Sequence, residues 1–425
     1  MIIAMVICFA ALLLLGMPIS VLLAATTAFV LLLFTNTPLT ILVQQLFNAL
    51  DNSVLLAIPF FILAGGIMTE GAIAKRLIAV MNLVVGRFRG GAAMSTVVAC
   101  MFFAALSGSS PATVVAIGSI MFPALIKAGY HKNFTTGLIT SAGSLGIVIP
   151  PSIPMILYCL VMNVSVAELF MAGILPGVLI GSVLMGYTYV LARKHNWRHE
   201  HDYKKGEVWR IVKEGVWGLM LPVIVLGGIY TGAFTPTEAA AVSVIYALTV
   251  EFVVFKDLTL KGLFKVSRES AVLSACLLFI LSCAMTFVWL LTSEQLPHHM
   301  ADFIIAHVNT WWMFMIGVSV FFLITGAAMD AVSAMIVLSP LFMETLNRFN
   351  IDYIHYGIVM VLMIEFGFLT PPFGLNLFVA MGITNQPLTT VARATMPFLL
   401  LILACIMLVT FIPDISLLLP KLLLR

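Results

Sequence analysis

The chain has 425 residues, of which 62% are hydrophobic and only 9% are Asp, Glu, Lys or Arg, and its formal net charge is +3. Its mean hydropathy is +1.14. This composition excludes a soluble globular protein, and apolar runs of about 20 residues are long enough to cross a hydrocarbon layer of about 30 Å as helices. No run shows the alternation of a transmembrane barrel, so we predict an all-α polytopic membrane protein.

The chain contains an internal repeat. The segment LGIVIPPSIPMILY matches FGFLTPPFGLNLFV, with Pro150 facing Pro371 at an offset of 221 residues. Upstream, Ser107 matches Thr325, and GMPISVLLAATTAFVLL matches FTPTEAAAVSVIYALTV, both at an offset of 218. Internal symmetry of this kind is typical of secondary transporters. It predicts repeats over 1–192 and 216–425, joined by a linker over 193–215.

Basic residues indicate that the two repeats are inverted. The stretch after the third predicted span carries Lys75, Arg76, Arg87 and Arg89, whereas its counterpart over 296–312 carries no Lys or Arg. Because positive residues collect on the cytoplasmic side, the two stretches are expected on opposite faces. The linker is expected to be cytoplasmic and both termini periplasmic, in a multi-pass protein of a bacterial inner membrane.

In chain order, each repeat is predicted to contain the same kinds of element. The first has scaffold helices within 1–72 (spans near 1–17, 18–36 and 54–72), an amphipathic arm over 74–91, a re-entrant hairpin over 92–127, a broken helix over 134–163 and a span over 168–192. The second has scaffold helices within 216–292, an arm over 296–311, a hairpin over 312–346, a broken helix over 353–382 and a span over 394–420. Basic residues at both ends of 92–127 require a hairpin there, because both ends must lie on one side.

The Pro-Pro pairs and the hairpin tips predict two sodium sites. Proline removes an amide donor and clashes with the preceding turn, so each broken helix should unwind near mid-membrane and free carbonyl oxygens for a cation. The first site is predicted to comprise Ser107, Gly108, Ser109, Ser110, Gly146, Val148 and Pro150. The second is predicted to comprise Thr325, Gly326, Met329, Gly367, Thr370 and Pro372. Proline kinks and small-residue packing are the alternative interpretation.

Other polar residues near the same centre are candidates for substrate contact, because the N-terminal ends of broken helices favour an anionic group. These are Ser110, Thr113, Ser152, Asp330 and Asn376, with an interhelical hydrogen bond as the alternative role for each. Intramembrane carboxylates indicate function, so Asp330 and Glu365 are candidates for ion or proton coupling. Glu70 and Glu238 lie at expected span ends and are assigned structural roles.

No nucleotide-binding loop occurs, so the energy should come from an ion gradient, and no catalytic residues or organic cofactor are expected. The segments SGSSPATVVAIGSIMFPALIKAGY, GIVIPPSIPMILY, LFMAGILPG, FTPTEAAA and GFLTPPFGLNLF resemble the large membrane subunit of TRAP transporters, the DctM-like permeases. This resemblance covers essentially the whole chain.

The resemblance implies a sodium-driven, elevator-type transporter of carboxylates. It also implies two partners: a small four-helix DctQ-like membrane subunit and a periplasmic substrate-binding protein. Within the family, the sequence looks closest to the sialic-acid branch, and a C4-dicarboxylate is the alternative substrate. A symporter that works without a binding protein, a channel or membrane scaffold, and an intramembrane hydrolase remain competing interpretations.

Overall fold

The structure is a computed structural model that describes residues 1–197, 205–328, 331–372 and 374–424. Every regular element in these residues is helical, which confirms the predicted fold class. The N-terminal half contains α1 (Ile2–Leu14), α2 (Ile19–Phe34), α3 (Thr40–Asn48), η1 (Ser53–Leu56), α4 (Ala57–Glu70), α5 (Ile73–Val85), α6 (Gly91–Ser107), α7 (Ser110–Lys127), α8 (Lys132–Ser144), η2 (Leu145–Ile147), α9 (Ile153–Met162) and α10 (Val166–His195).

The C-terminal half follows a similar order. It contains α11 (Lys205–Tyr230), α12 (Pro236–Thr249), η3 (Val250–Phe255), α13 (Leu260–Ser293), α14 (Leu296–His307), α15 (Trp311–Ala328), α16 (Ala331–Leu341), α17 (Met343–Arg348), α18 (Tyr353–Phe368), α19 (Leu375–Thr384), α20 (Leu388–Phe411) and α21 (Asp414–Leu423). Among the described residues, seven helices are long and apolar enough to span a membrane. The halves of the broken helices are shorter, because each stops at a Pro-Pro pair.

Several helix limits differ from the predicted ones. Helix α10 continues to His195 and α11 begins at Lys205, so both ends of the predicted linker are helical. The predicted single span over 394–420 is divided between α20 and α21, because Pro413 follows the last turn of α20. Helix α3 was not predicted, because it is short and carries several polar residues. Helix α1 has only 13 residues, fewer than a complete crossing of a bilayer requires.

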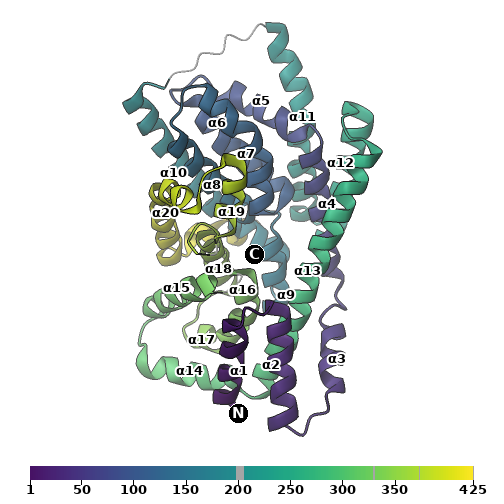
Figure 1. The fold of residues 1–425 in the computed structure, drawn as a ribbon, viewed down its shortest axis with the longest axis vertical. Helices are drawn as coiled ribbons and strands as arrows, with labels where there is room; N and C mark the ends of the chain where they lie inside the picture. Colours follow the sequence, from purple (N-terminus) through teal and green to yellow (C-terminus); the bar gives the residue numbers. More distant parts are fainter. Residues whose placement is uncertain (198–204, 329–330, 373, 425) are drawn as a thin grey trace.

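The helices form two groups that lie side by side (Figure 1). We call α1–α4 and α11–α13 the scaffold group; within it, α4 packs against both α12 and α13. We call α6–α10 and α15–α20 the central group, which contains both predicted hairpins and both broken helices. Helix α13 has 34 residues, which at 1.5 Å per residue gives a length of about 50 Å, and it runs along much of the long axis of the molecule.

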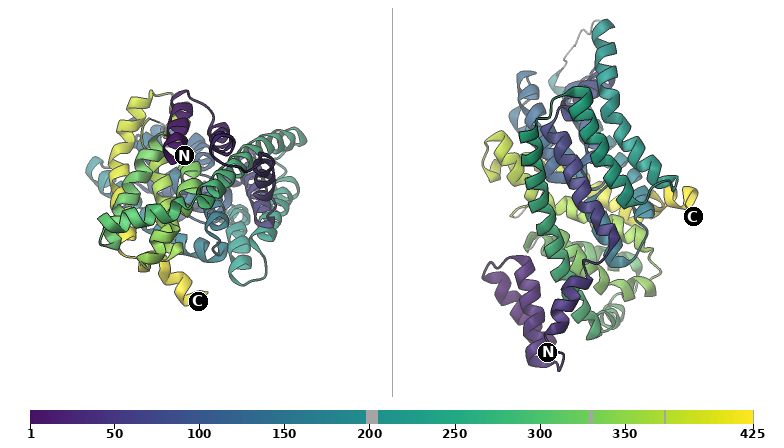
Figure 2. Two further views of the ribbon diagram at one scale, coloured as in Figure 1. Left: turned by 90° about the horizontal axis from the view of Figure 1, so that it is seen from below. Right: turned by 90° about the vertical axis from the view of Figure 1, so that its right-hand side faces the viewer.

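The two predicted arms, α5 and α14, lie toward opposite ends of the long axis (Figures 1 and 2). The first turn of α5 has no cap of its own, and Glu251 from the first turn of η3 supplies one. Its Oε1 accepts hydrogen bonds of 3.0 Å from the backbone N–H groups of both Ala72 and Ile73. One turn further, Arg76 pairs with Asp257 at 2.7 Å. Helix α5 is therefore attached to the scaffold group.

Helix α14 is attached differently. Its Asp302 lies 2.8 Å from Arg348 at the end of α17, which follows the second hairpin. Arg348 also contacts Glu344, one turn earlier in α17, at 3.4 Å. The ion pairs of α14 therefore tie it to the base of the second hairpin. Helix α5 is thus attached to the scaffold group, whereas α14 is attached to the central group.

The structural roles expected for two carboxylates at span ends are confirmed. Glu238 forms a capping box with Thr235 at the start of α12, accepting from the Thr235 backbone N–H at 2.8 Å. Such reciprocal bonds satisfy N–H groups that a helix leaves free at its first turn. Glu70, the last residue of α4, pairs with Lys265 of α13 at 3.0 Å. This pair connects two scaffold helices.

Candidate functional site

The tip of the first hairpin is a two-residue turn, Gly108 and Ser109, flanked by serines. Helix α6 ends at Ser107, Gly108 adopts a left-handed conformation with φ of +59°, and Ser109 is extended before α7 begins at Ser110. A left-handed backbone is strained for residues with a side chain, which explains glycine at this position. The hydroxyls of Ser107 and Thr113 lie 3.0 Å apart, and Thr113 donates to the Ser109 carbonyl at 2.9 Å. The turn thus gathers three oxygen atoms.

The first broken helix unwinds beside this tip. After α8 the chain forms the short η2 turn, passes through the Pro150-Pro151 pair in a cis peptide and begins α9 at Ile153. Ser152 caps α9: its hydroxyl accepts from the Met155 N–H at 3.5 Å and donates to the Ile147 carbonyl at 2.6 Å. Helix interruption by the Pro-Pro pair therefore leaves carbonyl groups outside regular helix.

The tip and the break are in direct contact. The Ile153 N–H donates to the Gly108 carbonyl at 3.2 Å, and Ser110 Oγ donates to the Gly143 carbonyl at 3.3 Å. Gly146 is so close that a Cβ atom there would lie 2.6 Å from the Ser109 carbonyl oxygen and 2.7 Å from Thr113 Oγ1. Glycine at this position is what allows the two segments to meet.

Most residues of the first predicted sodium site therefore lie together. Ser107, Gly108, Ser109 and Ser110 meet Gly146, and the carbonyl of Pro151 approaches Gly108. The carbonyl of Val148 instead packs against Gly173 of α10, where a Cβ would lie 2.6 Å from it. Hydroxyl and carbonyl oxygens are the ligand types that broken helices offer to sodium.

Three helix N-termini converge at the same tip. Helices α7 and α9 begin there, and α19 reaches it through Asn376, whose Nδ2 donates to Ser110 Oγ at 2.6 Å. Asn376 is fully buried, and its Oδ1 has no hydrogen-bond partner among the described residues. Each helix N-terminus carries a partial positive charge, so the arrangement favours a negative group. Of the substrate candidates, Ser110, Thr113 and Asn376 are brought together, whereas Ser152 serves as a helix cap.

The second predicted sodium site is less complete. Thr325 donates to the Phe321 carbonyl at 2.9 Å within α15, and Thr370 donates to the Phe366 carbonyl at 2.8 Å within α18. Gly326 lies in α15 and Gly367 in α18, while the Pro371-Pro372 pair, also cis, is exposed. Met329 and Asp330 lie outside the described residues. The second site stays a prediction.

A cavity of about 290 Å³ lies between the first hairpin tip and the scaffold group, beside the point where Ser107 packs against Gly65 of α4. On the hairpin side it is lined by Ser107, Ser109 and Pro111, and on the scaffold side by residues that include Thr69 of α4 and Ser270 of α13. Pockets of this size with a few convergent polar groups are typical of sites for small molecules. The scaffold lining was not predicted, because no local motif marks it.

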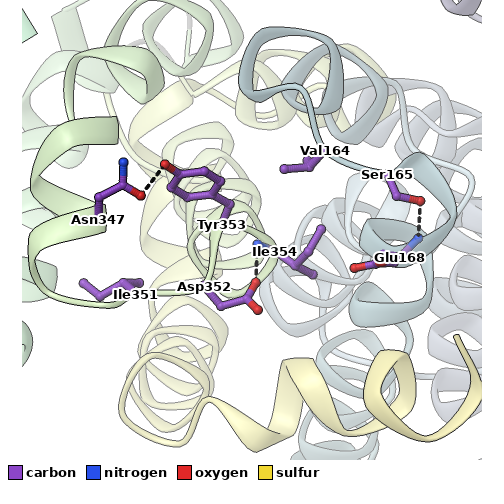
Figure 3. Close-up of a pocket in the computed structure, with 8 residues that line it drawn as sticks. All are labelled: Val164, Ser165, Glu168, Asn347, Ile351, Asp352, Tyr353 and Ile354. Carbon is purple, nitrogen blue, oxygen red and sulfur yellow. Dashed lines mark hydrogen bonds between the residues drawn. The ribbon is translucent and has the colours of Figure 1, made fainter. Parts of the chain in front are cut away.

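A second pocket, of about 330 Å³, lies where α9 leads into α10 and α17 into α18 (Figure 3). Its polar groups are used in local structure. Asp352 caps α18 by accepting from the Ile354 N–H at 2.7 Å, and Tyr353 donates to Asn347 Oδ1 at 2.6 Å. Ser165 caps α10 in the same way by accepting from the Glu168 N–H at 3.3 Å. We assign this pocket no role in transport.

Comparison with known proteins identifies the family. The model of the family described as "Tripartite ATP-independent periplasmic transporter, DctM component" matches residues 6–415. The chain is 42% identical to the C4-dicarboxylate TRAP transporter large permease protein DctM of Rhodobacter capsulatus, over 97% of each chain. It is 31% identical to the sialic acid TRAP transporter large permease protein SiaM of Vibrio cholerae, over 96% of this chain and 95% of the relative.

Among solved structures, the fold is similar to that of the Alcanivorax borkumensis YdaH transporter, with a TM-score of 0.60. The sequence identity is 15%, and the match covers 87% of this chain and 86% of the other, so the likeness concerns the fold alone. The resemblance noted in the sequence is thus confirmed for the family, while its sialic-acid branch is the more distant of the two relatives. The chain belongs to the DctM family and is the large permease component of a TRAP transporter.

Proposed function

We propose that this permease takes up a small carboxylate, with a C4-dicarboxylate preferred over sialic acid, and that sodium drives the uptake. The observation that carries the proposal is the contact between the SGSS tip of the first hairpin and the unwound break at Gly146. This contact gathers hydroxyl and carbonyl oxygens in one place, without a charged side chain among the hydrogen bonds given above.

Sodium fits this chemistry. A neutral cluster of oxygen atoms suits a monovalent cation with little preference for nitrogen or sulfur ligands. In the part of the chain that the structure describes, no group of three His, Cys, Asp or Glu side chains could hold a transition metal. The second site, at Thr325, Gly326, Met329, Gly367, Thr370 and Pro372, would supply a second cation from the other repeat.

The proposed substrate class follows from the three converging helix N-termini. They offer partial positive charge to a carboxylate without using a buried Lys or Arg. The Asn376 amide has two N–H groups, and the one that does not donate to Ser110 Oγ would supply a neutral donor to the carboxylate. The greater similarity to the C4-dicarboxylate permease than to the sialic-acid permease favours the smaller substrate.

We further propose an elevator mechanism. The central group would carry substrate and sodium past the scaffold group, with the cavity at Ser107 and Ser109 as one route of access. Sodium would bind first and hold the tip against the break, so that substrate binds to an ordered site. A small DctQ-like subunit and a periplasmic binding protein would complete the transporter, as the word tripartite in the family description suggests.

The test is uptake into proteoliposomes that contain this permease and its small subunit. Labelled succinate and labelled sialic acid are supplied in parallel, each with its binding protein and with or without an inward sodium gradient. We expect succinate uptake that requires both sodium and the binding protein. Uptake of sialic acid but not of succinate would refute the substrate assignment. Uptake without a sodium gradient would refute the proposed sodium coupling. Sodium-driven uptake without any binding protein would favour a simple symporter, and flux that never saturates would favour a channel.

A further inference from the structure

A polar cavity lies between α5 and the first helix of the second repeat. It has a volume of about 310 Å³ and is lined by charged side chains from three segments: Lys75 and Arg76 of α5, Arg210 and Glu214 of α11, and Asp257 just after η3. It shares no lining residue with the cavity beside the first hairpin tip. Both helices lie at the end of the molecule where cytoplasmic residues are expected (Figure 1). This cavity therefore needs an explanation other than substrate binding.

The acidic groups of the cavity already have a partner. Arg76 lies over the ring of Phe255, with its Cζ atom 3.6 Å from the ring centroid. From this position its Nη1 donates to Asp257 at 2.7 Å and its Nε donates to Glu214 at 3.4 Å. Among the described residues, Lys75 and Arg210 form no ion pair. Two cations thus line the cavity without a countercharge of their own.

The charge of the lining favours an anion. Three basic and two acidic side chains give a formal charge of +1, and Arg76 pairs with both carboxylates. Like charges that share a cavity repel each other, and an anion between Lys75 and Arg210 would remove this repulsion. Guanidinium and ammonium groups bind phosphate oxygens through charge-assisted hydrogen bonds. The chemistry of the cavity therefore suits a phosphate group.

The surface of α11 beside the cavity indicates the source of this phosphate. Trp209 is 71% exposed, and in membrane proteins tryptophan collects at the level of the lipid headgroups. Val216, Met220 and Val223 are also exposed and follow Trp209 at the spacing of one helix face. Arg210 adjoins Trp209 and so lies at headgroup depth. The apolar stripe gives an acyl chain a path into the bilayer, which a free phosphate ion would not need.

We propose that this cavity binds the phosphate of an anionic phospholipid of the cytoplasmic leaflet, with Lys75 and Arg210 as the two ligands. Basic pockets between helices on the cytoplasmic side of membrane proteins bind acidic headgroups. Gly215 of α11 packs against Val80 of α5 with no room for a Cβ atom, so the two helices already touch beside the cavity. The lipid bridges them a second time and strengthens the attachment of α5 to the scaffold group. The proposal does not depend on the substrate or on sodium coupling.

The first test is lipid binding to the purified full-length permease in a neutral detergent. Phosphatidylglycerol, phosphatidylcholine and glycerol 3-phosphate are titrated separately, and the melting temperature and the native mass spectrum are recorded. We expect phosphatidylglycerol to raise the melting temperature and to stay bound in the mass spectrum, and phosphatidylcholine to do so much less. Equal effects of the two lipids would overturn the proposal. Equal stabilisation by glycerol 3-phosphate would indicate a site for free phosphate and would overturn the assignment to a lipid.

The second test compares two double variants. Lys75→Gln/Arg210→Gln removes both ligands and should weaken phosphatidylglycerol binding by roughly 30-fold, because each basic residue at an anionic headgroup adds to the affinity. Lys213→Gln/Lys261→Gln is the matched control: it removes the same charge from α11 and α13 outside the cavity and should bind almost as tightly as the wild type. An equal loss in both variants would reduce the effect to overall charge and overturn the proposal.

Both ligands are exposed, so Lys75→Gln/Arg210→Gln should fold. If it does not, the comparison of the two lipids and glycerol 3-phosphate on the wild type still decides the matter. Neither readout involves transport, so the lipid site can fail or succeed independently of the proposed function.

Discussion

Replacing Gly146 by Ala tests whether the contact between hairpin tip and break forms a cation site. The added Cβ would lie 2.6 Å from the Ser109 carbonyl oxygen and 2.7 Å from Thr113 Oγ1, closer than non-bonded atoms approach. Insertion of a methyl group into a packed site costs about 1–3 kcal/mol. If the tip moves away to relieve this strain, the sodium ligands separate, and sodium affinity should fall by roughly 5- to 150-fold.

The assay is a sodium titration of succinate uptake in proteoliposomes, together with the melting temperature of each variant in detergent. Gly186→Ala in α10 is the matched control, because a Cβ there meets nothing within 4 Å and Ala is the better helix former. Gly186→Ala should keep the sodium affinity of the wild type. A folded Gly146→Ala protein with unchanged half-saturation by sodium would refute the placement of the first site.

Three further substitutions give distinct expectations. Glu251→Ala removes the cap of α5 and leaves two backbone N–H groups without a partner. The free energy of unfolding should therefore fall by about 2 kcal/mol, which is measured as a lower melting temperature. An unchanged melting temperature would contradict the capping role. Asn376→Leu removes the 2.6 Å hydrogen bond to Ser110. The KM for succinate should rise by roughly 2- to 10-fold, with little change in melting temperature. An unchanged KM would exclude Asn376 from the substrate site. Arg348→Gln breaks an exposed ion pair with Asp302. The free energy of unfolding should fall by less than about 1 kcal/mol, and added salt should remove this difference. A larger fall that persists in high salt would show that the pair is more than a surface contact.

The main features of the fold were predictable because each depends on a short stretch of sequence. Apolar run length predicts an all-helical membrane protein, and a Pro-Pro pair stops a helix wherever it occurs. The breaks between α8 and α9 and between α18 and α19 accordingly contain Pro150 and Pro371. The small polar turn after Ser107 was likewise visible as SGSS.

Contacts between distant residues were not predictable in the same way. Nothing near Glu251 in the sequence indicates that it caps a helix 179 residues away. The partner of Glu365 is an instructive case, because the repeat register already aligned it with Ser144, yet alignment of equivalents does not show that they touch. The direction of the Val148 carbonyl also depends on the packing of α10, which no periodicity reveals.

The opposite attachment of α5 and α14 determines where the chain must bend during the proposed movement. Because α5 is fixed to the scaffold group, any bending should occur at its far end, where Gly86, Gly90 and Gly91 lead into the first hairpin. Because α14 is tied to the base of the second hairpin, its joint lies on the scaffold side, at Gln295. In the proposed movement, α5 should therefore stay still while α14 travels. Rigid cross-links between α5 and the start of α6 should stop transport, whereas a cross-link between α14 and α17 should leave the transport rate unchanged.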